Sequence, residues 1–330
     1  NLLDTYLFTP LDVERHNINM RQGAVRVGAY VPGQLGINRP HPLLPGSRTP
    51  VEGLYLCGSS SGNGGGVNGA PGYINMLDAL TSWQLVRELK EATGKASAAS
   101  YKHVSPAGAA IAKPIDEAFK ESQFLKTTDF SPVASAYVRA RGGDRLCSFG
   151  DVLAVSDVVD VSLAQFLKTE VSDLIIAPGY EPEALKILSQ KKQGGFCMLE
   201  IDYDFMPTGI EKREIFGVTL AQERNSRLFT KADFKNVVSK NQDISEEALD
   251  TLLVAAISLK YTQSNSISVA YDGQIVGMGA GQQSRIHCTR LACDKADKWF
   301  LQRHPKVRGL AFKDGLKKVE KTNLIDQYLL

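Results

Sequence analysis

Apolar residues recur at helical spacing early in the chain, and a strand-like run follows them. The spacing predicts an amphipathic helix from Asn75 to Glu91, which ends at Gly94. The inward face of this helix would carry Met76, Leu80, Trp83, Val86 and Leu89. The small residues 96–100 then predict a buried strand that ends at Lys102 and His103, before a turn rich in proline and glycine. In open α/β sheets, ligands bind at that carboxyl edge of the strands.

Helix and strand patterns alternate through the next hundred residues. Ser131-Pro132 is a typical start for a helix that runs to Arg141, and Ser162 opens another helix that runs to Val171. Residues 173–176 and 196–201 read as buried strands. The helix between them, 181–190, has Leu185 and Leu188 on its inward face, and 191–195 is a polar turn. The pattern predicts a parallel βαβ unit and an α/β fold.

The last third of the chain repeats the alternation after a polar stretch. Residues 207–241 predict a connection, and Ser245 caps a helix that runs to Leu259. A hairpin over 269–276 turns at Asp272-Gly273, and a long helix extends over 284–303. The two halves therefore share a plan of helix, strand with a lysine (Lys102, Lys260), and polar loop.

Composition excludes several classes of function. The 330 residues suggest about two domains, and a net charge of +2 gives no reason to expect nucleic acid or an acidic membrane. No apolar run approaches the ~20 residues of a membrane span. The chain begins without methionine or a signal peptide, so we expect a fragment or an excised segment. Five scattered cysteines suit reduced thiols in a cytosol.

Residues 1–67 differ from the rest and predict an irregular segment of strands and loops. Their glycine-rich loop, Gly62 to Val67, follows a short apolar strand and resembles the C-terminal FAD-binding stretch of phytoene-desaturase-like flavoprotein oxidoreductases. A turn-rich loop without ligand is the alternative interpretation. The Gly-x-Gly-x-x-Gly start of a flavin domain is absent, so we do not expect FAD.

Lys102 and His103 are the strongest candidates for chemistry. Histidine can accept a proton near neutral pH, and a lysine can stabilise developing negative charge. Taken alone, the pair is more simply interpreted as a solvated Lys-His on a loop, because one short motif is weak support for a site. His287, Cys288 and Cys293 fit no zinc template, so we expect no metal.

A series of motifs then resembles the AICAR transformylase region of the bifunctional purine biosynthesis family. The resemblance runs from about residue 68 to 328, with motifs in the family's order. They are Lys102-His103-Val104-Ser105-Pro106-Ala107-Gly108, Ala140-Arg141-Gly142-Gly143-Asp144-Arg145, Ser148-Phe149-Gly150-Asp151, Glu170-Val171-Ser172-Asp173, Ala177-Pro178-Gly179-Tyr180, Lys260-Tyr261-Thr262-Gln263-Ser264-Asn265-Ser266 and the stretch from Gly279 to Leu291.

The resemblance implies a reaction and a set of roles. The family moves a formyl group from 10-formyltetrahydrofolate to the exocyclic amine of AICAR (aminoimidazolecarboxamide ribonucleotide). By resemblance, His103 is the base and Lys102 the electrostatic stabiliser or proton donor, while Asn265 orients the amine or polarises the formyl oxygen. The resemblance also implies that four residues of this chain occupy the family's substrate-binding positions: Gly150, Asp173, Arg285 and Ile286. The family also implies a cytosolic homodimer with sites at the interface.

The resemblance also implies a domain plan. It predicts two cytidine-deaminase-like α/β/α subdomains, 68–205 and a truncated 241–330, joined by a connection over 206–240. The zinc-deaminase signature is missing, so zinc hydrolysis is not expected. The family's phosphate-holding segment before residue 68, its region after Leu330 and its cyclohydrolase half are absent. We therefore expect weak or no activity from the chain as given, and a non-catalytic chimera or an oxidoreductase remnant stay as alternative hypotheses.

Overall fold

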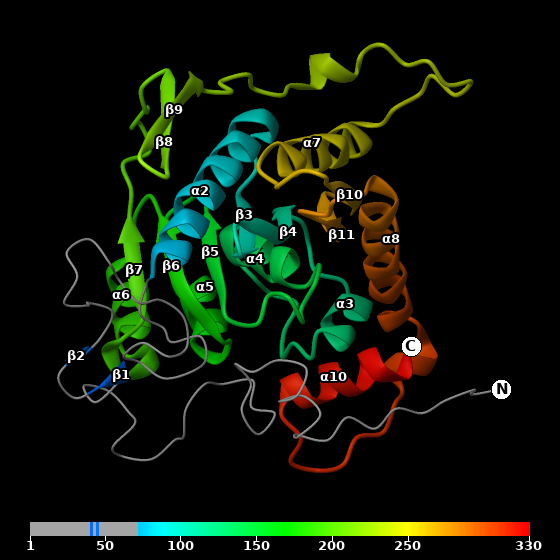
Figure 1. Cartoon of the computed structure of the whole chain (residues 1–330). Helices are drawn as coiled ribbons and strands as arrows, with labels where there is room; N and C mark the ends of the chain where they lie inside the picture. The colour runs from blue at the N-terminus through cyan, green and yellow to red at the C-terminus, as the bar shows by residue number, and fades with distance from the viewer. Residues whose placement is uncertain (1–39, 42–43, 46–71) are drawn as a thin grey trace, which may run out of the picture. The chain divides into compact units, whose positions relative to one another are not determined.

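The computed structural model describes residues 40–41, 44–45 and 72–330 (Figure 1). The chain divides into two units, 1–68 and 69–330. In the first unit, strands β1 (Pro40–His41) and β2 (Leu44–Pro45) pair antiparallel. The flavin-like glycine loop and the junction near residue 68 lie outside the described residues.

A seven-stranded mixed sheet organises the second unit. Its strand order is β10-β11-β4-β3-β5-β6-β7. Strand β3 is antiparallel to both neighbours, β4 and β5, whereas β5, β6 and β7 are parallel. The bounds are β3 (Ser97–Lys102), β4 (Ser105–Ile111), β5 (Asp151–Val155), β6 (Ser172–Ala177), β7 (Cys197–Glu200), β10 (Ile267–Tyr271) and β11 (Gln274–Gly279). The predicted α/β class and the parallel unit of β6 and β7 are confirmed.

Helices cover both faces of this sheet, as Figure 1 shows. Two of them, α2 (Tyr73–Thr93) and α7 (Glu246–Lys260), pack on one face around Trp83 and Ile257. The other face is covered by α4 (Pro132–Arg141), α5 (Val161–Thr169), α6 (Pro182–Ser189) and α8 (Arg285–Gln302). Shorter helices are α3 (Glu117–Ser122), α9 (Pro305–Arg308), α10 (Lys318–Tyr328), η4 (Lys191–Gly194) and η5 (Lys231–Phe234). The unit is thus a three-layer α/β/α sandwich.

Local sequence explains where the elements begin and end. The hydroxyls of Ser131 and Ser245 accept the backbone N–H groups of Ala134 and Ala248, which confirms both predicted helix starts. Gly94 ends α2 in the left-handed conformation, with φ 70°. The turn between β10 and β11 also has positive φ at both of its residues, as the Asp-Gly pair predicts.

Several predictions about single positions are wrong. Leu80 and Leu185 are exposed, because their helices bury Ala79 and Ala184 beside them instead. Helix α5 is capped by Asp160 rather than Ser162, since the Asp160 carboxylate accepts the N–H of Leu163. Lys260 ends helix α7 and does not lie on a strand, so the two halves lack the shared lysine-bearing strand.

The stretch 191–195 is also more than a polar turn. Lys191 is buried, and its ammonium donates to the carbonyls of Leu167 (3.0 Å) and Glu170. Burial lowers the pKa of Lys191 to about 8. This lysine therefore ties η4 to the end of α5.

The predicted connection over 206–240 contains a hairpin of its own. Strands β8 (Ile210–Ile215) and β9 (Val218–Glu223) pair antiparallel and form a separate two-stranded sheet. The hairpin stands away from the main sheet, and an extended segment leads from it to α7 (Figure 1). Nearly every residue of both strands is exposed.

The main sheet draws strands from both predicted subdomains, because β11 joins β4 through Gln274 and Ala110. The division into two subdomains stays a prediction. Within 72–330, no helix has the length and apolar character to cross a membrane. Across the described part of the chain, no three His, Cys, Asp or Glu side chains gather as they would around a metal ion.

Candidate active site

Lys102 and His103 lie at the tight turn that joins β3 to β4. Lys102 is the last residue of β3, and the turn consists of His103 and Val104, with φ 55° and 61°. The predicted turn at Ser105 to Gly108 is wrong, because these residues form strand β4. Positive φ is a strained conformation for a β-branched residue such as Val104. Backbone strain of this kind concentrates at functional sites, where the surrounding structure holds it in place.

Asp78 of α2 holds the strained turn. Its Oδ1 accepts the backbone N–H of Val104 at 2.5 Å. Burial raises the pKa of this carboxyl by more than the hydrogen bond from Val104 lowers it, so the pKa lies above its ordinary value. The helix on one face of the sheet therefore fixes the direction in which His103 leaves the backbone.

The Lys102 ammonium meets two of the predicted substrate-binding residues. It donates to the carbonyl of Phe149, the residue before Gly150. A Cβ placed on Gly150 would lie 3.4 Å from Lys102 Nζ and 3.6 Å from Asp173 Oδ2. Asp173 in turn pairs with Lys192 at 2.7 Å. The structure thus brings Lys102, Gly150 and Asp173 together.

In a fully parallel sheet the site would lie at the carboxyl ends of all the strands, but here it does not. Because β3 runs antiparallel to β5, Tyr101 pairs with Val152, near the start of β5. Gly150 and Asp173 likewise lie at the amino ends of β5 and β6. The site therefore combines the carboxyl end of β3 with the amino ends of its parallel neighbours.

His103 is exposed and lines a cavity of about 340 Å³ with Lys102. The opposite wall comes from β11 and α8, through Met278, Leu291 and Lys295. Lys295 pairs with Asp144 at 2.8 Å. The cavity offers a histidine and two ammonium groups beside apolar surface.

Asn265 reaches the same edge of the sheet from the second half of the chain. Its Nδ2 donates to the carbonyl of Gln282 at 3.0 Å, just beyond the end of β11. That end of β11 faces the start of β4, because the two strands are antiparallel. Arg285 and Ile286 occupy the exposed first turn of α8, outside the lining of the His103 cavity.

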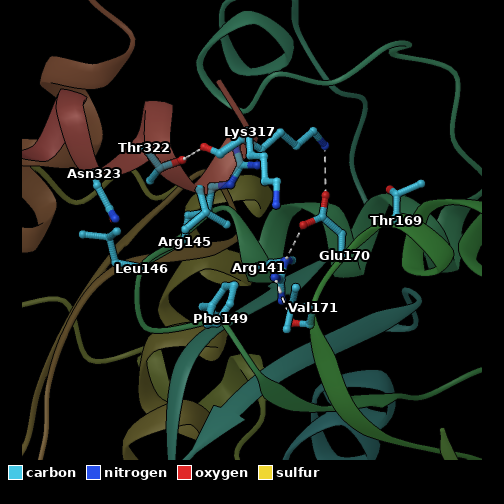
Figure 2. Close-up of a pocket in the computed structure, with 12 residues that line it drawn as sticks. Arg141, Arg145, Leu146, Phe149, Thr169, Glu170, Val171, Lys317, Thr322 and Asn323 are labelled. Atoms are coloured by element: carbon cyan, nitrogen blue, oxygen red, sulfur yellow. Dashed lines mark hydrogen bonds and ion pairs between the residues drawn. The ribbon is translucent and has the colours of Figure 1, made fainter. Parts of the chain in front are cut away.

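A larger cavity, of about 650 Å³, adjoins the Phe149–Gly150 turn (Figure 2). Phe149 and Leu146 supply apolar surface, and Arg145 and Lys317 supply positive charge. Burial lowers the pKa of Arg145 to about 10, so its guanidinium is still charged at neutral pH. The cavity suits a ligand with a flat apolar part and an anionic part.

Sequence reasoning missed several residues of this region. Asp78, Lys192 and Lys295 each contact the site or line its cavities, and none was predicted. Asp78 carried a usable signal, because an acidic residue on the inward face of an amphipathic helix needs a partner. Lys192 and Lys295 carried no comparable signal, since their partners are distant in sequence.

The fold and site define an α/β protein with a lysine and a histidine side by side at the turn that joins β3 to β4. Comparison with known proteins identifies the family: the profile of the AICARFT/IMPCHase bienzyme matches residues 59–295. The chain belongs to this family. The match begins inside the segment that resembles a flavoprotein.

Individual relatives agree with this assignment. The bifunctional purine biosynthesis protein PurH of Roseobacter denitrificans is 30% identical over 68% of the chain. PurH of Leuconostoc citreum is 32% identical over 68% of the chain, and PurH of Lactobacillus acidophilus is 29% identical over the same share. The chain spans only 38% to 39% of the length of these relatives.

Proposed function

We propose that the chain carries the formyl-transfer site of its family, with AICAR as acceptor and 10-formyltetrahydrofolate as donor. The observation that carries the proposal is the strained turn that aims His103 into a cavity beside Lys102. Gly150 lies beside both Lys102 and Asp173, and the family resemblance implies substrate binding at Gly150 and Asp173.

The reaction needs a base, a stabiliser of the oxyanion and an acid. In our proposal, His103 takes a proton from the exocyclic amine as its nitrogen attacks the formyl carbon. The Lys102 ammonium stabilises the oxyanion and gives a proton to the folate nitrogen as the carbon–nitrogen bond breaks. Asn265 orients the amine or the formyl oxygen, and its bond to Gln282 fixes the plane of its amide.

The two cavities suit the two substrates. The carboxylates of folate would meet Arg145 and Lys317 in the cavity of Figure 2, and Phe149 would stack against its rings. AICAR would lie between Gly150, Asp173 and His103, with Arg285 and Ile286 at the outer rim. Leu146 lines both cavities, so the formyl group would have a short path between them.

We further propose a homodimer that forms through the β8–β9 hairpin. An isolated two-stranded hairpin is marginally stable in water. This hairpin exposes several large apolar side chains and both of its edges. They are Ile210, Ile215, Phe216, Val218 and Leu220. A second copy of the chain would cover this surface. We also propose that the protein is cytosolic, because its cysteines would stay reduced there.

Single-turnover formyl transfer tests the proposed function. With the chain in excess over 10-formyltetrahydrofolate, a single turnover can be followed even when it is slow, and we expect the unmodified chain to formylate AICAR only weakly. His103→Ala should lower the rate by ~10²–10⁴, and Lys102→Ala should be comparably damaging. His287→Ala and Lys186→Ala, on the surfaces of α8 and α6, serve as matched controls and should leave the rate unchanged. Full activity in the His103 or Lys102 variant would remove that residue from the mechanism.

A further inference from the structure

A buried arginine lies directly behind the turn that holds Lys102. Arg141 is the last residue of α4, and its side chain is only 5% exposed. Burial alone would lower its pKa, but the neighbouring acidic groups Tyr137 and Asp151 raise it above the ordinary value. The guanidinium is therefore a permanent charge inside the protein.

Its donors bind both sides of the Phe149–Gly150 turn. Nη1 donates to the carbonyl of Ser148 at 2.6 Å and to Oδ1 of Asp151 at 2.9 Å. These are the residues immediately before and after the turn. Nη2 donates to the carbonyl of Val171 at 3.2 Å, and Nε donates to Glu170 at 3.3 Å, a pair visible in Figure 2.

Hydrogen bonds connect the Phe149–Gly150 turn to Lys102 as well. The Gly150 N–H donates to the Val171 carbonyl at 2.9 Å, so one carbonyl accepts from both Gly150 and Arg141. The peptide between Phe149 and Gly150 is thereby fixed, and the Phe149 carbonyl is the acceptor of the Lys102 ammonium. Asp151 also accepts the hydroxyl of Ser100, two residues before Lys102, at 2.6 Å.

We propose that Arg141 is a positioning residue for the proposed formyl transfer, which it serves by holding the Phe149 carbonyl and, through it, the Lys102 ammonium. The proposal rests on the proposed function for its catalytic meaning. A lysine at this position would keep the charge but could not bridge Ser148 and Asp151 on one side and Val171 on the other, because its donors share one nitrogen.

Arg139 provides a matched control. It lies on the same helix, its side chain is 6% exposed, and it pairs with Asp272 in the β10–β11 turn. Replacing it removes an equally buried guanidinium without touching the Phe149–Gly150 turn.

The decisive test compares Arg141→Lys with Arg139→Lys by the acetylation rate of single lysines, measured by mass spectrometry with N-acetoxysuccinimide as the probe. Lys186 on the surface is the reference, and buried Lys260 reports general loosening. In Arg141→Lys, the Lys102 rate should rise ~3–10-fold, since one charge-assisted hydrogen bond is lost. Lys260 should not change, and Arg139→Lys should change neither lysine.

An unchanged Lys102 rate in folded Arg141→Lys would overturn the proposal, as would an equal rise in Arg139→Lys. If circular dichroism shows that Arg141→Lys does not fold, Glu170→Gln decides instead. That variant removes one partner of Arg141 and should raise the Lys102 rate ~2–3-fold, and no rise would count against the proposal.

The turnover measurement separates this inference from the proposed function. In Arg141→Lys, kcat should fall ~10–100-fold because the ammonium is misplaced, while KM for AICAR stays nearly constant. If Lys102→Ala retained full turnover, the proposed mechanism would fail, yet the acetylation rates would still decide whether Arg141 positions Lys102.

Discussion

Replacing Gly150 with alanine, compared with the same replacement of Gly94, distinguishes the effect of backbone strain on stability from the effect of a crowded site on binding. Gly150 and Gly94 have the same φ of 70°. Alanine in the left-handed conformation costs about 1–2 kcal/mol, so both variants should lose similar stability. For a unit of this size, that loss lowers Tm by roughly 2–8 °C.

Only Gly150→Ala should affect ligand binding. Its Cβ would lie 3.4 Å from Lys102 Nζ and 3.6 Å from Asp173 Oδ2, whereas a Cβ on Gly94 would meet nothing within 4 Å. A methyl group between the ammonium and the carboxylate takes space that our account gives to AICAR. Overpacking costs about 1–3 kcal/mol, which corresponds to ~5–150-fold weaker binding.

Isothermal titration with AICAR and thermal unfolding of both variants measure these two effects. Gly94→Ala should unfold earlier but bind AICAR as the unmodified chain does. Equal affinity in the two variants would refute the placement of AICAR beside Gly150. A much larger loss of stability in Gly150→Ala would show that the methyl group disturbs the fold rather than the ligand.

Three further predictions concern a salt bridge, the interface and the second cavity. Burial tends to raise the pKa of Asp144, but the Lys295 ammonium and the hydrogen bonds from Cys147 together outweigh this effect and lower the pKa. The pair thus stabilises the fold above about pH 4, and this contribution disappears as the pH falls further. The stability of Asp144→Asn, measured by urea unfolding, should lack this acid-sensitive contribution. An acid dependence of stability equal to that of the unmodified chain would contradict the assignment. Phe216→Ser should shift the chain toward monomer in light scattering, while Leu185→Ser on α6 should not, and equal masses for both would count against the hairpin interface. Arg145→Met should weaken folate binding ~10-fold or more by removing a charged hydrogen-bond donor, with AICAR affinity unchanged, and equal folate affinity would exclude the cavity of Figure 2.

The sequence predicted the elements of the fold well, because periodicity and capping act locally. The Ser131 and Ser245 caps, the left-handed Gly94 and the Asp272-Gly273 turn each depend on neighbouring residues alone. Errors arose where burial depended on the rest of the fold, as at Leu80 and Leu185.

The candidate site was predicted in part. Lys102 was expected at the end of a strand, and the structure confirms that position. Its surroundings could not be predicted, because they depend on β3 running antiparallel to β5. No local pattern distinguishes that pairing from a parallel one, and so the amino ends of β5 and β6 were not expected at the site.

The buried charges show the same limit. Arg141 and Lys191 look like surface residues in the sequence, since charged side chains are seldom buried without partners. Their partners come from other elements, and only the folded chain brings them together. These partners include Ser148, Asp151, Val171 and Glu170.

The position of bound AICAR tests the central claim most directly. A crystal structure of the chain with AICAR and a non-reactive analogue of 10-formyltetrahydrofolate would show which atoms meet the exocyclic amine. Our account predicts the amine within ~2.6–3.2 Å of a His103 ring nitrogen, the usual reach of a general base. It also predicts the Lys102 ammonium beside the donor's formyl position. AICAR bound away from the His103–Val104 turn, with the amine in contact with neither residue, would contradict the account.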